Sequence, residues 1–556
     1  MSEMILPGVS IQVRPEGLII PGRVSVGTLG VVGTASRGAV ETPVILGSYA
    51  EAQERFGDYD PYDPDNPGGE LTLVRALELA FGHGATSVIA VRVASGSAAK
   101  ADFLLDSGSG ACCRLAAKSE GSWGNALEVN VWDAEEHAYV RDETHPGGAP
   151  ITLNYTPVVE SARNRISVFE DATRRTRVLE IVYDTAPQAG QVRINTSSGA
   201  LTFFGGEEPA AADTVTASYV VDRSVSVKVT LRHGPVEEIY TVASGKDLVA
   251  DIEALSSLVD AEEEANSAEP PDKFGGADDF RFFGTGSNTR GDDGAIGADY
   301  KKGLDRLLEE PAHIIVAAGQ GHEAIGADLT AHCQTASSDQ NKRERIGVVG
   351  SGAGEKLDDI LGHTLDSDRI VLVAPGIETV DRPSGGTVTL PGSYAAAAVA
   401  GLMSSHSAQV SLTNKPLAVQ GLEEKYTNAE LARLVQARVL ALQEKLGFRI
   451  VKGITTATNT AWHQITTRRI VDYAKFGVRS AANPYIGLLN NERVRGALRA
   501  TINSFLAEMV NDEKLVGYEL DVTATREEER QGIARVTMVL RPTFSIDYIK
   551  VTMYLE

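Results

Sequence analysis

The sequence predicts a multidomain protein that combines an α/β core with a β-rich insertion and an α+β C-terminal region. At 556 residues the chain is too long for one hydrophobic core, since single cores rarely exceed ~250 residues. Strand and helix patterns alternate up to residue 93 and again from residue 299, and short β-patterns dominate between them. The 42% hydrophobic and 23% charged residues are ordinary for a globular protein.

The first α/β stretch carries the patterns of a βαβ unit. An apolar run at 25–32 predicts a buried strand, and Ser48 is suited to cap a short helix at 48–56. A second helix and a second strand are expected at 71–81 and 87–93. Because strands separated by helices usually lie side by side in a parallel or mixed sheet, we expect such a sheet here.

The middle of the chain changes to short β-patterns divided by turn residues, which is typical of an all-β insertion. A helix is expected at 246–259, and the acidic, proline-containing residues 261–273 predict an exposed linker. The expected strands are 180–183, 191–195, 200–204, 214–221 and 226–231.

From residue 299 the α/β pattern resumes and is expected to complete the sheet, with buried strands at 314–318, 346–349 and 370–373. The last zone, 448–556, is expected to be α+β. Within it, residues 491–511 predict an amphipathic helix. Its apolar face consists of Val494, Leu498, Ile502, Phe505 and Met509.

Both ends of the chain show the alternation of a strand with one buried face. A strand must satisfy its backbone groups through a partner. The two ends therefore pair either with each other inside one monomer or with another molecule by strand addition. The apolar residues of these strands are Val9, Ile11 and Val13 at the start, and Ile549, Val551, Met553 and Leu555 at the finish.

The net charge of −23 argues against direct nucleic-acid binding, which depends on neutralising phosphates with Lys and Arg. The stretch 447–500 is different, because nine basic residues accompany only Asp472 and Glu492 there. This stretch is either a solvated arginine-rich face or a surface that binds an acidic partner. The nine residues are Arg449, Lys452, Arg468, Arg469, Lys475, Arg479, Arg493, Arg495 and Arg499.

Sequence signatures of cofactor and metal sites are missing. The glycine runs at 27–33 and 284–286 lack the G-x-G-x-x-G spacing, and no G-x-x-x-x-G-K-[ST] loop is present, so no nucleotide cofactor is expected. In the zinc-binding motif H-E-x-x-H the two histidines are four residues apart, so that they share one face of a helix. This spacing is absent, and no metal is expected. The residues considered for it are His322, Glu323, His332 and Cys333.

No secretory signal or long apolar run is seen, so we expect neither secretion nor membrane insertion. Three cysteines, two of them adjacent, are too few for a disulfide framework and indicate a reducing compartment.

The stretch Ser393-Tyr-Ala-Ala-Ala-Ala-Val-Ala-Gly401, preceded by Pro391-Gly392, resembles the segment that carries the nucleophile in subtilisin-like proteases, with Ala397 in place of proline. A triad also needs a base and an orienting carboxylate. The strand that should end in that aspartate reads His313-Ile-Ile-Val-Ala-Ala-Gly319, with alanines where the aspartate is expected. We therefore expect a subtilisin-like α/β core without a catalytic triad and without enzymatic activity.

A series of short motifs resembles the contractile-tail sheath proteins of bacteriophages and related injection systems. The resemblance rests on the order and spacing of the motifs and covers nearly the whole chain apart from the β-rich insertion. The motifs are Pro7-Gly-Val9, Gly30-Val-Val-Gly-Thr-Ala-Ser-Arg-Gly38, Thr42-Pro-Val44, Phe56-Gly57, Ala117-Lys-Ser-Glu-Gly-Ser-Trp-Gly-Asn125, Gly453-Ile-Thr-Thr456, Arg468-Arg-Ile470, Phe505-Leu506 and Gly517-Tyr-Glu-Leu-Asp-Val522.

This resemblance implies a structural subunit that polymerises with copies of itself into a six-fold helical sheath around an inner tail tube. The sheath would contract without nucleotide hydrolysis and drive the tube through a target cell envelope. Its other partners would be baseplate and tail terminator proteins. Its location would be a virion tail or an injection-system particle, assembled in the host bacterial cytoplasm.

The resemblance also assigns roles along the chain. Both terminal strands are expected to pair with neighbouring subunits. The C-terminal domain is expected to contact the inner tube through Arg493, Arg495 and Arg499, with Arg468, Arg469 and Lys475 as further candidates. The expected domains are an N-terminal arm (1–21), a subtilisin-like core (22–100 and 263–407), an outward-facing insertion (101–262), a tube-facing α+β domain (408–541) and a C-terminal arm (542–556).

Two other functions stay open on the sequence alone. A subtilisin-like serine hydrolase would require a reactive Ser393. Another self-assembling shell or surface-layer protein would form flat arrays rather than hollow tubes.

Overall fold

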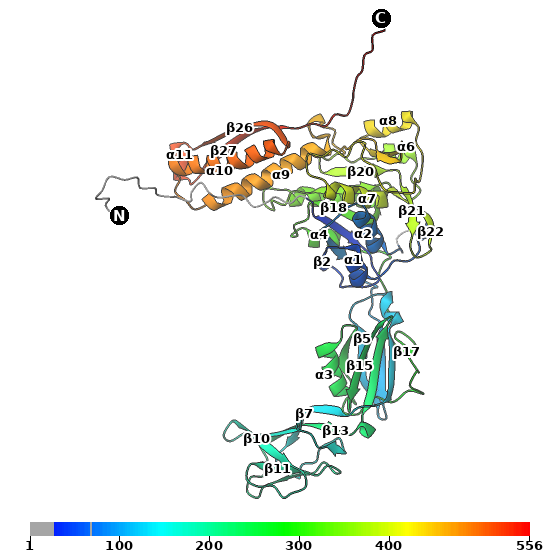
Figure 1. The fold of residues 1–556 in the computed structure, drawn as a ribbon, viewed down its shortest axis with the longest axis vertical. Helices are drawn as coiled ribbons and strands as arrows, with labels where there is room; N and C mark the ends of the chain where they lie inside the picture. The colour runs from blue at the N-terminus through cyan, green and yellow to red at the C-terminus, as the bar shows by residue number, and fades with distance from the viewer. Residues whose placement is uncertain (1–26, 67–68, 149, 556) are drawn as a thin grey trace, which may run out of the picture. The chain divides into compact units, whose positions relative to one another are not determined.

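The computed structural model describes residues 27–66, 69–148 and 150–555, which divide into two compact units (Figure 1). The first unit contains residues 27–35, 40–95 and 295–555 of the described chain. The second contains Ser36–Ala39 and Gly96–Gly294. The second unit is thus inserted into the sequence of the first, whose sheet is built from segments on both sides of it.

An eight-stranded sheet forms the centre of the first unit, in the order β2-β3-β1-β18-β19-β20-β24-β25. The strands from β3 to β24 run parallel, and β2 and β25 join the edges antiparallel. β1, β3, β19 and β20 are buried along their whole length, as parallel strands covered on both faces must be. The bounds are β1 Leu29–Gly33, β2 Pro43–Leu46, β3 Val88–Arg92, β18 Ile314–Gly321, β19 Ile346–Gly350, β20 Ile370–Ala374, β24 Leu440–Glu444 and β25 Phe448–Ile450.

Helices cover both faces of this sheet. Successive residues of β1 divide between two cores: Val31 packs with α2 and α7, and Val32 packs with α4 and α5. Ser48 caps α1 as predicted, because its side chain accepts a hydrogen bond from the Glu51 N–H. The helices are α1 Tyr49–Phe56, α2 Thr72–Gly82, α4 Tyr300–Leu307, α5 His322–Ala336, α6 Leu357–Leu361, α7 Gly392–Ser405 and α8 Asn428–Gln436. A small sheet consists of β21 Ile377–Asp381, β22 Gly386–Leu390 and β23 Gly421–Leu422.

The end of the first unit forms what we call the C-terminal module, residues 465–542 (Figure 1). The predicted helix at 491–511 is confirmed, with Asn491 as its cap, and its apolar face packs in a core with α9, β26 and β27. The elements are α9 Ile465–Ala482, α10 Glu492–Asn511, β26 Leu515–Thr523, α11 Arg526–Arg530 and β27 Arg535–Pro542.

The second unit is β-rich, as the sequence predicts for this part of the chain. Its sheets have the orders β12-β11-β10-β9-β13-β7, β15-β14-β6-β17 and β16-β5-β4, with β8 paired to β13. Its helix is α3 Gly245–Leu255. The strands are β4 Asp102–Ser107, β5 Gly110–Ala117, β6 Glu128–Asp133, β7 Ala138–Pro146, β8 Val158–Val159, β9 Arg165–Glu170, β10 Arg175–Val182, β11 Gln191–Ile194, β12 Leu201–Phe203, β13 Thr214–Val221, β14 Val227–His233, β15 Val236–Val242, β16 Val259–Glu263 and β17 Arg281–Phe282.

Two stretches differ from the sequence-based expectation. The start of the predicted linker 261–273 is part of β16, which pairs with β5, and β17 pairs with β6. These backbone hydrogen bonds extend the second unit to Gly294, beyond the expected boundary at 262. Similarly, β24 pairs with β20, so part of the expected domain 408–541 belongs to the central sheet.

Candidate assembly surfaces

The two long helices of the C-terminal module meet at a contact that requires a glycine. Phe505 of α10 stacks on Tyr473 of α9, with ring centroids 5.9 Å apart. A Cβ atom at Gly477 would lie 1.9 Å from the Phe505 ring, far inside van der Waals contact. Glycine inside a helix is usually unfavourable by roughly 1 kcal/mol relative to alanine. Its presence in α9 is therefore explained by the close approach of the Phe505 ring.

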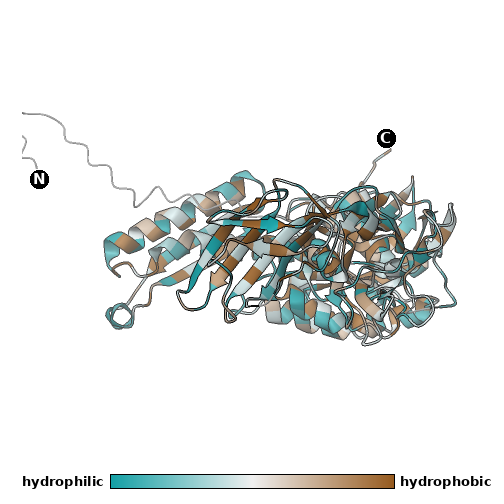
Figure 2. Ribbon diagram, turned by 90° about the horizontal axis from the view of Figure 1, so that it is seen from below, coloured by the Kyte–Doolittle hydropathy of each residue, from teal (hydrophilic) through white to brown (hydrophobic). Residues whose placement is uncertain are grey.

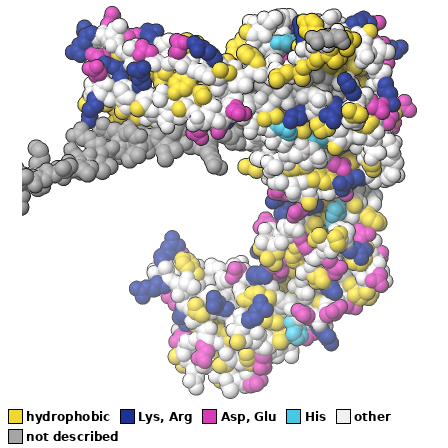
Figure 3. Space-filling view, turned by 45° about the horizontal axis from the view of Figure 1, so that its top comes forward, with side chains coloured by type: hydrophobic (Ala, Val, Ile, Leu, Met, Phe, Trp, Pro, Cys, Tyr) yellow, Lys and Arg dark blue, Asp and Glu magenta, His cyan; other side chains and the backbone are white. Residues whose placement is uncertain are grey.

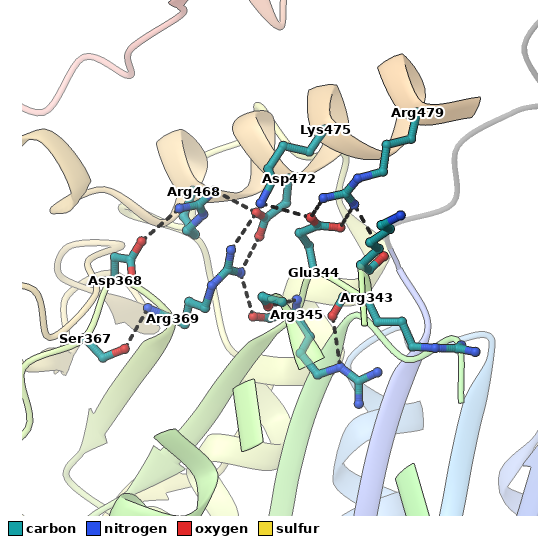
Figure 4. Close-up of polar contacts among 12 residues, drawn as sticks. Arg343, Glu344, Arg345, Ser367, Asp368, Arg369, Arg468, Asp472, Lys475 and Arg479 are labelled. Carbon is teal, nitrogen blue, oxygen red and sulfur yellow. Dashed lines mark hydrogen bonds and ion pairs between the residues drawn. The ribbon is translucent and has the colours of Figure 1, made fainter. Parts of the chain in front are cut away.

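A buried ion-pair network connects α9 to the central sheet (Figure 4). Asp472 of α9 accepts hydrogen bonds from Arg369 at 2.8 and 3.0 Å and from Arg468 at 2.7 Å. Arg468 also binds Asp368 at 2.8 Å. The side chains of Arg369, Asp472 and Arg468 are only 8%, 10% and 7% exposed. Because Arg369 directly precedes β20, the network fixes α9 to the start of that strand.

A second buried carboxylate, that of Glu344, binds two basic side chains further along α9. Lys475 lies 3.1 Å and Arg479 lies 2.6 Å from its oxygen (Figure 4). Burial opposes ionisation of Glu344, but the hydrogen bonds from Arg479 and Lys475 outweigh it, so its pKa lies below the ordinary value. Since Glu344 precedes β19, α9 is bound at a second point of the sheet.

Arg468 and Arg469 are not on the exposed basic surface that the sequence predicts. Arg468 belongs to the network above, and Arg469 donates a hydrogen bond to the carbonyl oxygen of His406. Burial lowers the pKa of Arg469 to about 10. Lys475 is partly exposed but paired with Glu344. The reason is that α9 presents these side chains to the sheet, and a basic run does not reveal which helix face is covered.

The three arginines predicted on α10 have different surroundings. Arg493 and Arg499 are exposed. The Arg495 side chain is only 14% exposed, and its guanidinium binds Glu529 at 3.0 Å and the Asn490 side chain at 2.9 Å. On the face of the module seen in Figure 3, basic side chains are interspersed with acidic ones. Arg493 and Arg499 are therefore better placed than Arg495 to meet a partner.

The C-terminal segment is anchored at Asp547. Lys452 lies 3.5 Å from the Asp547 carboxylate, and Thr413 donates a hydrogen bond to it at 3.4 Å. From Tyr548 to Leu555 the described chain forms no helix or strand, and Figure 1 shows this segment leaving the module. The residues predicted to be the buried face of a strand are all exposed: Ile549 by 81%, Val551 by 74%, Met553 by 85% and Leu555 by 99%.

The β26–β27 hairpin has unpaired edges in the described part of the chain, because its sheet contains only these two strands. One face of β27, with Val536, Met538 and Leu540, packs on the core of the module, and the other is exposed. Unpaired strand edges present rows of N–H and C=O groups to any extended segment that approaches. The N-terminal candidates Val9, Ile11 and Val13 lie outside the described residues.

Ser393 is at the start of α7, directly after Pro391-Gly392. The residue is 1% exposed, and its Oγ has no hydrogen-bond partner among the described residues. The hydroxyl group therefore has neither a base that would activate it nor an open approach for a substrate.

Two of the four candidate metal-binding residues around α5, His322 and His332, have other partners. His322 lies 3.1 Å from a Glu355 oxygen, and His332 accepts a hydrogen bond from Arg345 at 2.9 Å. Burial, with the charge of Arg345, lowers the pKa of His332 to about 3. Glu323 lies in the first turn of α5, and Cys333 is fully buried. Over the described ranges, no three His, Cys, Asp or Glu side chains are grouped so that they could hold a metal ion.

Hydrophilic residues interrupt the hydrophobic ones along the helices in Figure 2. In the part of the chain that the structure describes, no helix combines the length and the apolar character needed to span a membrane.

Sequence reasoning missed the buried network and the anchor at Asp547. Arg468 and Asp472 are four residues apart in a helical pattern, which indicates an ion pair on one helix face. Nothing in the sequence indicates that Arg369, about a hundred residues earlier, completes it.

Residues 293–456 match the family model of the phage tail sheath protein central domain, and residues 457–556 match that of the phage tail sheath C-terminal domain. No curated protein matches the chain.

Two solved structures share the fold. The sheath tail protein of Desulfitobacterium hafniense has a TM-score of 0.58 and 13% identity, over 96% of this chain and 100% of that one. The sheath tail protein Lin1278 of Listeria innocua has a TM-score of 0.55 and 12% identity, over 95% and 98%. Identities this low show a common fold. The two family matches follow each other without a gap, so residues 293–556 correspond to the central and C-terminal domains of the phage tail sheath family.

Proposed function

We propose that this chain polymerises with copies of itself around an inner tube, and that the resulting sheath contracts without nucleotide hydrolysis. As the two family matches indicate, the chain is a structural subunit of a contractile sheath. The observation that carries the proposal is the exposed alternating segment 548–555, next to a hairpin whose edges pair with no other described strand. Such a segment can add a strand to the β26–β27 hairpin of a neighbouring subunit.

Physical chemistry favours this use of the segment. Burying one Val, Ile, Leu or Met side chain contributes about 1.5–3 kcal/mol, so the four alternating residues offer roughly 6–12 kcal/mol before ordering is subtracted. A donor surface and a different acceptor surface make a heterologous contact, which repeats into a helical array rather than a closed dimer. We extend the same role to Val9, Ile11 and Val13 of the N-terminal arm.

Deleting residues 548–556 tests the strand addition. This deletion keeps Asp547 and its contact with Lys452, so the monomer should fold normally. We expect negative-stain electron microscopy to show hollow striated tubes for the full chain and none for the truncated chain. Deleting residues 1–15 should have the same effect. Normal tubes from the truncated chain would refute the role of the segment.

A matched pair of double variants separates side-chain burial from chain length. Val551→Ser with Met553→Ser changes the face expected to be buried, and Lys550→Ser with Thr552→Ser changes the opposite face. We expect the first pair to prevent tube formation and the second to leave it intact. Equal behaviour of the two pairs would contradict a strand with one buried face.

For the inner tube we propose contact through Arg493 and Arg499, with Arg495 in a supporting position. Exposed charges of this kind attract an acidic surface and are weakened by salt, so they can release when the subunits move outward. Arg493→Glu with Arg499→Glu should weaken attachment to the tube in a salt-dependent co-sedimentation assay, while self-assembly persists. Arg433→Glu, on the distant helix α8, is the control. Unchanged attachment in the α10 variant would refute this placement.

We further propose that the extended sheath is metastable and that contraction moves subunits into a better-packed lattice. Baseplate and tail terminator proteins would be further partners of the sheath. The sheath would be part of a virion tail or injection-system particle assembled in the host bacterial cytoplasm. The two family matches support these proposals.

We also infer that the core is a subtilisin-like scaffold without catalysis. The parallel sheet and the start of α7 at Gly392 support the scaffold, and the buried, unpartnered Ser393 hydroxyl supports the lack of hydrolysis. A fluorophosphonate probe should therefore leave Ser393 unlabelled, and labelling there would favour a serine hydrolase.

A further inference from the structure

The central sheet has a topological switch point between β1 and β18. After β1 the chain builds β2 and β3 on one side of it, and all later strands of the sheet lie on the other side, beginning with β18. At such a point the loops after the two strands turn in opposite directions and leave a crevice at their carboxyl ends. Ligands of open α/β sheets bind in this crevice.

A cavity of about 200 Å³ lies at this crevice. Its lining includes Gly319 and Gln320 at the end of β18, Thr72 at the start of α2, and Tyr300 at the start of α4. The volume exceeds that of a single bound water, whose share of the liquid is ~30 Å³. It is sufficient for a small molecule of a few heavy atoms.

Two polar atoms of the lining residues have no hydrogen-bond partner among the described residues. They are the Oε1 atom of Glu70 and the hydroxyl oxygen of Tyr394. Tyr394 is fully buried, and its hydroxyl lies beside Gly319, where an added Cβ atom would come within 3.1 Å of it. Buried polar groups are nearly always satisfied, so two unpartnered oxygens on residues that line one cavity point to an absent binding partner.

The side chains that line the cavity favour a positively charged ligand. The residues that line it include a carboxyl group and three tyrosines, and none of them is Lys, Arg or His. The nearby Arg75 is held by Asp381 at 2.7 Å, with both side chains almost fully buried. An anion such as a phosphate would therefore meet no basic side chain in the lining, and the charge of the nearby Arg75 is already neutralised by Asp381. A cation would meet the Glu70 carboxylate, hydroxyl oxygens and the aromatic faces of the cavity.

We propose that this cavity binds a small primary ammonium compound. Its N–H groups would donate to Glu70 and to the hydroxyl oxygen of Tyr394, and its carbon chain would pack against the tyrosine rings. The site is separate from the surfaces proposed for assembly, so its failure and the failure of sheath formation are distinguishable.

Isothermal titration of the full chain with n-propylammonium chloride tests the proposal, with 1-propanol and K⁺ as comparison ligands. We expect saturable binding of propylammonium and no binding of the neutral alcohol. Glu70→Gln should weaken binding at least tenfold and Tyr394→Phe several-fold. Glu54→Gln, an exposed carboxylate on α1, should not change it. Equal affinity in Glu70→Gln would overturn the site, and binding of K⁺ alone would overturn the ammonium ligand.

A measurement on the unmodified protein is independent of how the variants fold. Desolvation raises the pKa of Glu70 to about 7, opposed by the charge of Arg75, the charged residue that faces it. A cation prefers the ionised carboxylate, so affinity should rise about tenfold between pH 6 and pH 8. An affinity that is independent of pH over this range would refute the role of Glu70.

Discussion

Replacing Asp472 by asparagine tests whether the buried network holds the C-terminal module to the sheet. The variant keeps the shape of the side chain but removes the charge that neutralises Arg369 and Arg468, whose side chains are 8% and 7% exposed. Arg468 keeps Asp368 at 2.8 Å, whereas Arg369 loses its ion-paired carboxylate. Removing one partner of a buried ion pair costs about 3–5 kcal/mol. This is a large fraction of the ~5–15 kcal/mol that stabilises a typical domain.

Thermal unfolding followed by circular dichroism should show a decrease in Tm of roughly 5–15 °C for Asp472→Asn. The control is Asp358→Asn, which breaks an exposed pair with Arg433 whose side chains are 87% and 56% exposed. Exposed pairs contribute about 0–1 kcal/mol, so this variant should unfold almost like the wild type. Replacing Arg369, Arg468 and Asp472 together by Met and Leu should recover much of the loss. A Tm for Asp472→Asn within about 1 °C of the wild type would refute the reasoning.

Two further predictions concern packing and pH. Gly477→Ala should destabilise the protein by about 1–3 kcal/mol in urea unfolding, because the new Cβ meets the Phe505 ring. The same change at Gly496 of α10, where a Cβ would meet nothing within 4 Å, should instead stabilise by about 0.5–1 kcal/mol; stabilisation in both variants would contradict the packing argument. Glu70, whose pKa is raised to about 7 by burial, binds its proton more tightly in the folded state, so its contribution to stability falls as pH rises through 7. Between pH 5 and pH 8, in the absence of a ligand, the free energy of unfolding of the wild type should therefore fall by about 2–3 kcal/mol relative to that of Glu70→Gln. Parallel pH profiles of the two free energies would contradict this.

Local patterns made much of the fold predictable. The spacing of Leu498, Ile502 and Phe505 indicates the buried face of α10, and Ser48 indicates the start of α1, because these signals act within a few residues. Pairing between distant segments left no such signal. The acidic stretch after Val259 begins with a strand because β5, more than a hundred residues earlier, offers it an edge. Charge runs were the least informative, since Arg469 is buried and Arg499 is exposed in the same basic stretch.

The anchor at Asp547 restricts which neighbour could receive the C-terminal segment in the proposed strand addition. Because Lys452 and Thr413 hold Asp547, only residues 548–555 of the described chain are available to reach another subunit. At about 3.3 Å per residue, these eight residues span at most roughly 26 Å. The acceptor strand must therefore lie within that distance of Asp547 in every state of the sheath in which the link is kept. A contraction that separates neighbouring subunits by more would have to break the added strand, so neighbours connected by this segment must rotate past each other with their linked edges close together.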